Sequence, residues 1–395
     1  MSVSNRSNTL RRLTGAGLLL GCGRAVAERV NFQPPVTPTA HEIYGLHMMM
    51  FWICVGIAIV VFGAMFYSMY HHRKSRGAVA ATFHENTKLE ILWTIIPFAI
   101  LVVVAIPATK TLLYIENTSN ADMTVKVTGM QWRWKYHYVD QDNNPNNDVS
   151  FISTILPDQI KASDSGSEAA IDKLNTAKHP YLLTVDHELV LPVKKRIRFL
   201  ITGADVIHSF FVPQFGIKKD AIPGYVNETW TEIQKPGTYY GQCAELCGKG
   251  HAFMPIVIHA VSDADFNKWY AAKKAAAEKE AAAAASNKTY SKDKLFAMGK
   301  AVFHGKGGCF GCHGANGEGT NIAPALKGSK IATGPIPAHL HIVLHGKKGT
   351  PMPAFAKQLN NLDIAAVVTY ERNAWGNNTG DVIQPRDVAA ARKAR

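Results

Sequence analysis

Two thiols, an imidazole and a thioether lie close together in the run Cys243-Ala-Glu-Leu-Cys247-Gly-Lys-Gly-His251-Ala-Phe-Met254. Soft sulfur ligands and imidazole nitrogen select copper or zinc over hard cations such as magnesium. The run follows a strand-like segment and precedes another that starts at Pro255, so we expect it to form a loop between two strands. Gly248 and Gly250 permit the tight backbone path on which both sulfurs and the ring would converge. The sequence therefore predicts a metal site on this loop.

The two cysteines are compatible with several kinds of site. In an exported protein Cys243 and Cys247 could form a simple disulfide, or they could hold a tetrahedral zinc ion with His251 and one further histidine. A blue single-copper site uses one cysteine, so the second thiol argues against it. Two thiolates could instead bridge two coppers, which requires a second terminal histidine. His208, in the segment Asp205-Val-Ile-His-Ser-Phe-Phe-Val-Pro213, is available for that role.

A second pattern, Cys309-Phe-Gly-Cys312-His313, matches the C-x-x-C-H sequence of covalent haem attachment. The two cysteines would form thioethers with the haem, and the adjacent histidine would ligate its iron. A thioredoxin-like redox pair usually lacks the trailing histidine. For the sixth ligand, Met352 lies between two prolines that stiffen its loop. Its rivals are Met298, His304, His339, His341 and His345.

Two long apolar segments indicate that these sites are anchored in a membrane. Met48–Tyr70 and Ile91–Leu113 lack Asp, Glu and Arg, and each is long enough to cross the hydrocarbon core. The loop between them is rich in His, Lys and Arg, so the positive-inside rule predicts that it faces the cytoplasm. Both termini and the candidate redox sites would then lie on the periplasmic side of the inner membrane.

Residues 1–27 have the layout of a signal peptide. Arg6, Arg11 and Arg12 precede a short apolar run and then small residues. Cleavage after Ala27 and lipidation at Cys22 both fit this pattern, and both remain open.

Composition limits the class of protein. The 395 residues carry a formal net charge of +13, with 47% hydrophobic and 18% charged residues. The chain is too apolar for a disordered protein and too charged for a polytopic membrane protein, and its length suggests two or three domains. Although the chain is basic, the membrane segments argue against a nucleic-acid partner.

The exported region, residues 116–262, predicts a β-sandwich or barrel because it contains short β-branched segments between turn residues. Trp132 and Trp134 alternate, so we expect them on the same face of a strand, with Trp134 in the core. Residues 158–178 are polar and predict an inserted loop. The expected strands are Thr124–Thr128, Trp132–Tyr138, Leu182–Val185, Arg196–Thr202 and Pro255–Val261.

The rest of the chain divides by composition into three parts. Residues 263–290 are rich in Ala, Lys and Glu, which favours a semi-rigid helical linker. Residues 291–375 contain helical patterns and predict a compact domain, and residues 376–395 predict a solvated tail.

Several of these segments resemble subunit II of haem–copper cytochrome c oxidases, in that family's order, over about residues 40–262. The resemblance is carried by Leu92-Trp-Thr-Ile-Ile-Pro97, Gln131-Trp-Arg-Trp134, Asp205–Pro213, Asp220–Asn227 and Tyr240–Pro255. It implies a transmembrane helical hairpin at 40–115 and an all-β cupredoxin domain with a binuclear copper centre. Residues 291–375 resemble all-α class I cytochrome c domains. The whole chain is thus similar to the cytochrome-c-fused, caa-type form of subunit II.

The resemblance also implies particular ligands. Both cysteines of the copper loop would bridge the two metals. His208 and Met254 would complete one copper, and His251 and the backbone carbonyl of Glu245 the other. The Glu245 side chain would bind a magnesium ion at the interface with the catalytic subunit. The implied copper ligands are His208, Cys243, Glu245, Cys247, His251 and Met254.

Two further roles follow from the same resemblance. Trp132 matches the tryptophan through which electrons reach the copper centre. Glu90 matches the acid at the mouth of a proton channel, although Thr87-Lys-Leu-Glu90 also fits a helix capping box. In the cytochrome region the resemblance favours Met352 as the partner of His313, a pair that raises the haem potential. The haem-binding residues would be Cys309, Cys312, His313 and Met352.

The implied function is that of an electron-accepting subunit in a proton-pumping terminal oxidase. Electrons from an upstream respiratory donor would pass through haem c and the copper pair to haem a and copper in a catalytic subunit I. Subunit III would be a further partner. This chain itself supplies no oxygen-reducing site. Two alternatives are the copper-containing subunit of a nitric oxide reductase and an anchored periplasmic electron carrier that works without a catalytic partner.

Overall fold

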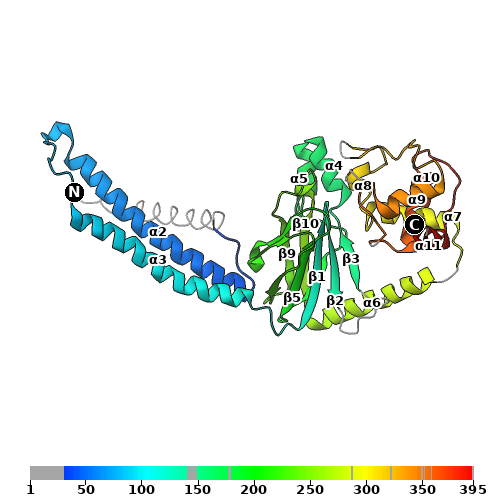
Figure 1. The fold of residues 1–395 in the computed structure, drawn as a ribbon, viewed down its shortest axis with the longest axis horizontal. Helices are drawn as coiled ribbons and strands as arrows, with labels where there is room; N and C mark the ends of the chain where they lie inside the picture. The colour runs from blue at the N-terminus through cyan, green and yellow to red at the C-terminus, as the bar shows by residue number, and fades with distance from the viewer. Residues whose placement is uncertain are drawn as a thin grey trace, which may run out of the picture. The chain divides into compact units, whose positions relative to one another are not determined.

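The structure is a computed structural model that describes residues 31–139, 149–176, 179–285, 288–320, 323–347, 350, 352–356 and 358–393 (Figure 1). It divides into two compact units. One comprises the chain up to Glu116 together with Pro213–Gly216, and the other comprises Asn117–Val212 and the chain from Ile217 onward. The expected signal peptide, with its alternatives at Ala27 and Cys22, lies outside the described residues.

The first unit contains two long helices, α2 (Pro38–His71) and α3 (Thr87–Glu116), joined through the 3-10 helix η1 (Lys74–Arg76). Thr37 caps α2, because its hydroxyl accepts a hydrogen bond from the amide of Ala40. Both helices are long and apolar enough to cross a membrane. Their apolar side chains are largely exposed, as a lipid-facing surface requires. The predicted pair of apolar helices is confirmed.

The start of α3 differs from the predicted capping box of Thr87 and Glu90. The amide of Leu89 donates to the side chain of Asn86 at 3.3 Å, so Asn86 is the capping residue. Glu90 therefore lies one residue beyond the capping-box position, and its side chain is exposed. Its carboxylate still lies in the first turn of the helix, where negative charge is favourable.

The second unit begins with a β-sandwich, which we call the sandwich domain (residues 117–262). Its strands are β1 (Met123–Met130), β2 (Arg133–Val139), β3 (Ser150–Ser153), β4 (Leu189–Pro192), β5 (Ile197–Gly203), β6 (His208–Val212), β7 (Ile217–Ala221), β8 (Asn227–Thr231), β9 (Gly237–Cys243) and β10 (Pro255–Val261). One sheet has the order β3-β2-β1-β5-β8 and the other β4-β10-β9-β6-β7. Trp134 and Phe210, from opposite sheets, pack edge to face at 5.4 Å in the core. The predicted β-sandwich is confirmed.

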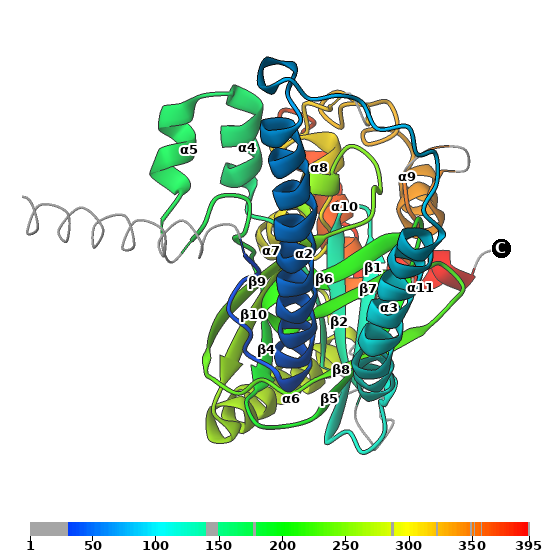
Figure 2. The same ribbon diagram turned by 90° about the vertical axis from the view of Figure 1, so that its left-hand side faces the viewer.

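Three local predictions for this domain are wrong. Residues 182–185 form no strand, and Val185 makes an isolated bridge to Ile155. The expected loop at 158–178 contains two short helices, α4 (Pro157–Ser165) and α5 (Glu168–Leu174), which lie side by side (Figure 2). Trp132 precedes β2: it lies in the turn between β1 and β2, so it shares no strand face with Trp134.

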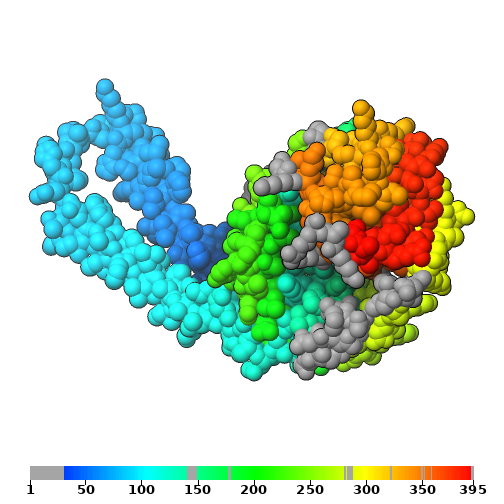
Figure 3. Space-filling model, turned by 45° about the vertical axis from the view of Figure 1, so that its right-hand side comes forward, coloured from blue at the N-terminus to red at the C-terminus, as the bar shows by residue number. Residues whose placement is uncertain are grey.

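After the sandwich comes α6 (Asp263–Ala285), the helix predicted for the linker. Its first turns are not free, because Phe266, Trp269 and Tyr270 pack their rings against Tyr138 of β2. The C-terminal domain (residues 288–393) follows, with α7 (Lys292–His304), α8 (Phe310–His313), α9 (Ile336–His345), α10 (Asn361–Asn373) and α11 (Pro385–Lys393). In the space-filling view its orange and red segments form one compact body (Figure 3).

The predicted solvated tail at 376–395 is wrong for most of its length. Ile383 and Val388 are fully buried in the core formed by α7, α9 and α10. The side chain of Gln384 bonds to both backbone groups of Tyr290, at the start of the domain. These two buried residues are five positions apart, which matches neither the helix nor the strand period, so the sequence pattern does not indicate that the segment is buried.

We expect Ile383→Ala to lower the free energy of unfolding of the C-terminal domain by about 2–5 kcal/mol, the usual range for truncating a buried isoleucine. Denaturant titration followed by near-ultraviolet circular dichroism measures the loss. Arg386→Ala, at an exposed position on α11, serves as the control and should leave the midpoint nearly unchanged. A midpoint for Ile383→Ala equal to that control would mean that the tail does not contribute to the fold.

Candidate metal and haem sites

The sulfur-rich loop lies at one end of the sheet that contains β6, β9 and β10. Cys243 is the last residue of β9, and Met254 immediately precedes β10. His251 begins the 3-10 helix η3 (His251–Phe253) within the loop. His208 is the first residue of β6, which pairs with β9 through Phe210 and Cys243. Sheet register therefore brings His208 to the loop from a distant part of the sequence.

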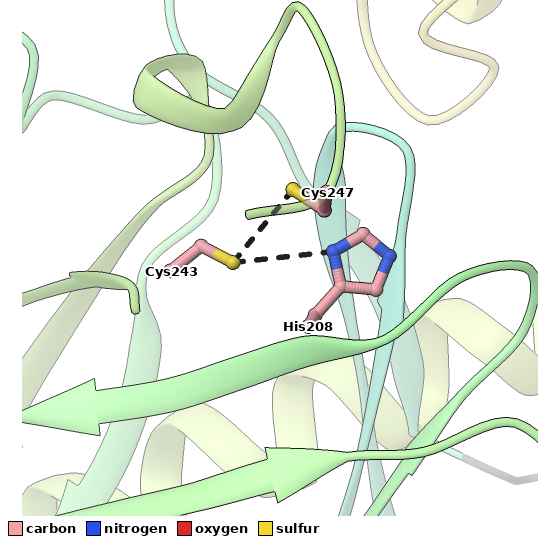
Figure 4. A group of neighbouring side chains, drawn as sticks. All are labelled: His208, Cys243 and Cys247. Carbon is pink, nitrogen blue, oxygen red and sulfur yellow. Dashed lines mark hydrogen bonds between the residues drawn. The ribbon is translucent and has the colours of Figure 1, made fainter. Parts of the chain in front are cut away.

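The predicted copper ligands lie together. The Sγ atoms of Cys243 and Cys247 are 3.8 Å apart, and Nδ1 of His208 lies 4.0 Å from the Cys243 sulfur (Figure 4). His251 Nδ1 and Met254 Sδ each lie 3.5 Å from the Cys247 sulfur. The carbonyl oxygen of Glu245 lies 3.3 Å from the Cys243 sulfur, whereas the Glu245 side chain is exposed. The site thus contains two thiol sulfurs, two ring nitrogens, one thioether sulfur and one carbonyl oxygen.

This donor set fits copper. The sulfurs are too far apart for a disulfide, whose S–S bond is about 2 Å long, and both thiols are free. Their separation is less than two metal–sulfur bonds of about 2.3 Å each, so a single metal ion can contact both sulfurs. Sulfur and imidazole are the ligands that copper prefers. The remaining donors lie around both sulfurs, as bridging thiolates would require.

The two thiols do not titrate independently. A hydrogen bond between the two sulfurs outweighs the effect of burial and lowers the pKa of Cys243 well below its usual value. The same hydrogen bond, together with burial, raises the pKa of Cys247. The pair therefore loses one proton easily and holds the second tightly. A metal cation that binds both sulfurs must displace this second proton.

Asp205 orients the histidine of the site. Its carboxylate lies 2.9 Å from Nε2 of His208 and also accepts hydrogen bonds from the backbone amides of Val206 and Gln131. Burial opposes ionisation of Asp205, but these bonds outweigh it and hold the pKa of the carboxyl below its usual value. Burial likewise lowers the pKa of His208, but the bond to Asp205 outweighs it and the net shift is upward. With a proton on Nε2 directed at Asp205, Nδ1 is left to face the sulfurs.

The turn between β1 and β2, which we call the hairpin tip (Gln131 and Trp132), covers the copper loop. The side chains of both residues donate to the carbonyl oxygen of Cys247, at 2.9 and 3.0 Å. A Cβ at Gly250 would lie 2.3 Å from the Trp132 ring, so a glycine is needed there for the indole to pack on the loop. Trp132 is thus placed against a predicted copper ligand.

The second site is a cavity in the C-terminal domain. The four predicted haem-binding residues line it together with apolar side chains, among them Leu326, Ile342, Val343 and Phe355. Burial raises the pKa of both thiols, Cys309 and Cys312, which suits sulfur that ends as a neutral thioether. His313 Nδ1 lies 2.8 Å from the carbonyl of Pro324, which fixes the ring and leaves Nε2 for a metal. The donors and the apolar walls fit a covalently bound haem.

Among the described residues that line this cavity, Met352 is the one thioether. His339 also lines it, but its Nε2 lies 2.8 Å from the Glu371 carboxylate. The other rivals make contacts elsewhere: Met298 packs in a separate cluster, His304 stacks on Phe310, and the rings of His341 and His345 contact each other at a tilt. The geometry therefore favours Met352 as the sixth ligand.

Several residues at these sites have no clear signal in the sequence. Asp205 was visible three positions before His208, a spacing that could have suggested a supporting carboxylate. Gln131, Arg133 and Pro324 were not predicted, because they act through contacts with segments far away in the sequence.

We expect Asp205→Asn to weaken copper binding about 10- to 100-fold, because the histidine loses the carboxylate that fixes its tautomer. Competition with a chelator of known affinity measures the change in the full-length chain. Asp172→Asn, which neutralises an exposed carboxylate on α5, is the matched control. An affinity unchanged from that control would show that Asp205 does not support the metal site.

Comparison with known proteins finds matches along most of the chain. Residues 123–261 match the family described as cytochrome c oxidase subunit II, periplasmic domain, and residues 25–111 match the transmembrane domain of the same subunit. Residues 295–370 match the family described as cytochrome c oxidase, cbb3-type, subunit III. The periplasmic domain of subunit II of cytochrome oxidase from Bradyrhizobium japonicum, a crystal structure, is 45% identical, with 40% of this chain and 96% of that chain covered and a TM-score of 0.32.

Several relatives are named as subunit 2 of cytochrome c oxidase. The "Probable cytochrome c oxidase subunit 2" of Rickettsia conorii is 40% identical over 264 residues, which cover 66% of this chain and 78% of the relative. Its counterpart in Rickettsia bellii is 41% identical over 260 residues, covering 66% of this chain and 90% of the relative. The cytochrome c oxidase subunit 2 of Cereibacter sphaeroides is 34% identical over 273 residues, covering 65% and 88%. The chain therefore belongs to the family of cytochrome c oxidase subunit II, in a form that carries a cytochrome c domain at its C-terminal end.

Proposed function

We propose that this chain receives electrons on a covalent haem c and passes them through a binuclear copper centre to the oxygen-reducing subunit of a proton-pumping terminal oxidase. One observation carries the proposal. Gln131, Trp132, Arg133 and Asp205 of the sandwich domain line the same cavity as the four predicted haem-binding residues. The hairpin tip also bonds to the carbonyl of Cys247 in the copper loop. One short segment of chain thus contacts both candidate redox sites.

The copper centre would be held by His208, Cys243, the Glu245 carbonyl, Cys247, His251 and Met254. The bound copper pair would accept and release one electron at a time. The protein holds the donors in place beforehand: β6 and β9 fix His208 and Cys243, and Asp205 keeps Nδ1 of His208 directed at the sulfurs. Four of these residues, His208, Cys243, Cys247 and Met254, are buried, so the packing around them would limit their movement during transfer. Trp132 lies against the loop on the side of the haem cavity and would be the route of transfer.

The partners follow from this role. Catalytic subunit I, with haem a and copper, would take electrons from the copper centre, and subunit III would complete the complex. The exposed Glu245 side chain is free to reach a magnesium ion at the boundary with subunit I. The helices α2 and α3 would anchor the chain in the inner membrane with both redox domains on the periplasmic side. Glu90, exposed in the first turn of α3, would then lie at the cytoplasmic face, where proton uptake begins.

Co-purification tests this function against its alternatives. We expect a tagged full-length chain, extracted in mild detergent, to bring with it a partner that contains haem a and copper and consumes oxygen. A partner with haem b and non-haem iron would identify a nitric oxide reductase instead. Extraction without any haem-containing partner would identify an anchored electron carrier and contradict the oxidase proposal.

We expect Met352→Ala to abolish the weak red-edge absorption band of the oxidised, methionine-ligated haem and to lower the haem potential, because the thioether ligand raises it. Optical spectra and potentiometry of the full-length protein measure both effects. Met298→Ala, which removes a thioether from a separate cluster, is the control and should keep the band. Persistence of the band in Met352→Ala would assign the sixth ligand elsewhere.

A further inference from the structure

Arg133 connects the sandwich domain to the haem-attachment loop. It is the first residue of β2 and follows the hairpin tip directly, paired across the turn with Met130. Its side chain is 5% exposed although it carries a charge. Nη1 donates a hydrogen bond of 2.8 Å to the carbonyl of Gly307, two residues before Cys309. The guanidinium carbon also lies 5.5 Å from the ring centre of Phe355, three residues after Met352. One side chain thus contacts both loops that carry the predicted haem ligands.

The haem-attachment loop is shaped to receive this side chain. Gly308 has φ near +59°, and a Cβ at that position would lie 2.0 Å from Nη1 of Arg133. Any other residue at position 308 would therefore displace the guanidinium or the loop. The close approach across the domain boundary depends on a glycine immediately before the first haem-binding cysteine.

The charge of Arg133 is buried with little compensation. Within the described parts of the chain no carboxylate lies at ion-pairing distance from it, and Nε meets no acceptor. Burial lowers the pKa of Arg133, and the nearby negative charge of Asp205 opposes that shift. Burying a cation is costly unless other groups compensate it, and the carbonyl of Gly307 and the ring of Phe355 are the partners that the C-terminal domain supplies here.

We propose that Arg133 is a positioning residue that docks the chain's own C-terminal domain on the hairpin tip and raises the potential of the haem. The proposal rests on the function proposed above, because it requires both redox groups. Docking holds the haem cavity against Trp132, which bonds to the carbonyl of Cys247. The fixed positive charge favours the reduced iron, which carries one positive charge less than the oxidised iron. The step concerned moves one electron from the reduced iron to the oxidised copper pair, and no proton moves and no bond forms or breaks.

The direct test compares Arg133→Gln with the parent protein in the purified full-length complex. A laser-generated reductant reduces the haem, and absorbance follows the electron to the copper pair. A hydrogen bond from a charged group contributes about 1.5–3 kcal/mol. Its loss should therefore lower the equilibrium constant for docking about 10- to 100-fold. We expect the rate of electron transfer to fall by up to the same factor, because transfer occurs in the docked form. The haem potential, measured by potentiometry, should fall. Arg198→Gln removes a half-exposed arginine from β5 of the same sheet and should change neither quantity.

Two further variants test the same contact. Arg133→Lys retains the charge but lacks the planar fork, so it should restore the haem potential more fully than the transfer rate. Gly308→Ala disturbs the same contact from the haem-attachment loop, and it provides the test if Arg133→Gln does not accumulate. Slower electron transfer in Gly308→Ala supports docking, and an unchanged transfer rate overturns the inference. If Arg133→Gln keeps the copper and haem spectra and shows the transfer rate and haem potential of the parent protein, this inference is overturned while the proposed function stands. Absence of the copper or haem spectrum from the parent protein would instead contradict the proposed function.

Discussion

The carbonyl oxygen of Cys247 accepts two hydrogen bonds, one from the side chain of Gln131 and one from the indole of Trp132. These bonds tie the turn between β1 and β2 to the loop that carries most of the candidate copper ligands. The backbone amide of Gln131 bonds to Asp205, which holds the remaining histidine, and the next residue after the tip reaches the haem-attachment loop. A shift of the hairpin tip would therefore disturb both candidate sites together. The β-sandwich fixes the tip, since β1 is paired on both sides.

Electrostatics prepares the two sites in opposite ways. The copper loop gathers groups that favour negative charge: a thiol pair that readily loses its first proton and a carboxylate stabilised by three hydrogen bonds. Such a cluster suits a cation, which takes the place of the remaining thiol proton. The haem cavity is apolar and raises the pKa of its cysteines, so it disfavours thiolates and accommodates neutral sulfur. Two of the charged side chains that line it, Arg133 and Asp205, come from the sandwich domain.

Local signals in the sequence predicted much of this arrangement. The C-x-x-C-H pattern and the clustered sulfur ligands predicted the ligands that lie within one loop, because ligand spacing within a loop reflects local geometry. The family resemblance added the Glu245 carbonyl and favoured Met352. The structure places all ten candidate residues in two groups. Predictions failed where contacts between distant segments decide the outcome. Ile383 and Val388 lack a periodic pattern, yet they are buried by α7, α9 and α10. Trp132 alternates with Trp134, but register places a turn between β1 and β2 that removes it from the strand. Arg133 could not be predicted at all, since its partner is 174 residues away.

The central claim is that Cys243 and Cys247 bridge two coppers in the same chain that binds a covalent haem. Metal analysis with electron paramagnetic resonance on the purified full-length chain tests it most directly. We expect two coppers for each haem, and in the oxidised form a hyperfine pattern from one unpaired electron shared equally by both copper nuclei. A pattern from a single copper nucleus, zinc in place of copper, or a Cys243–Cys247 disulfide in protein matured with copper would contradict the claim.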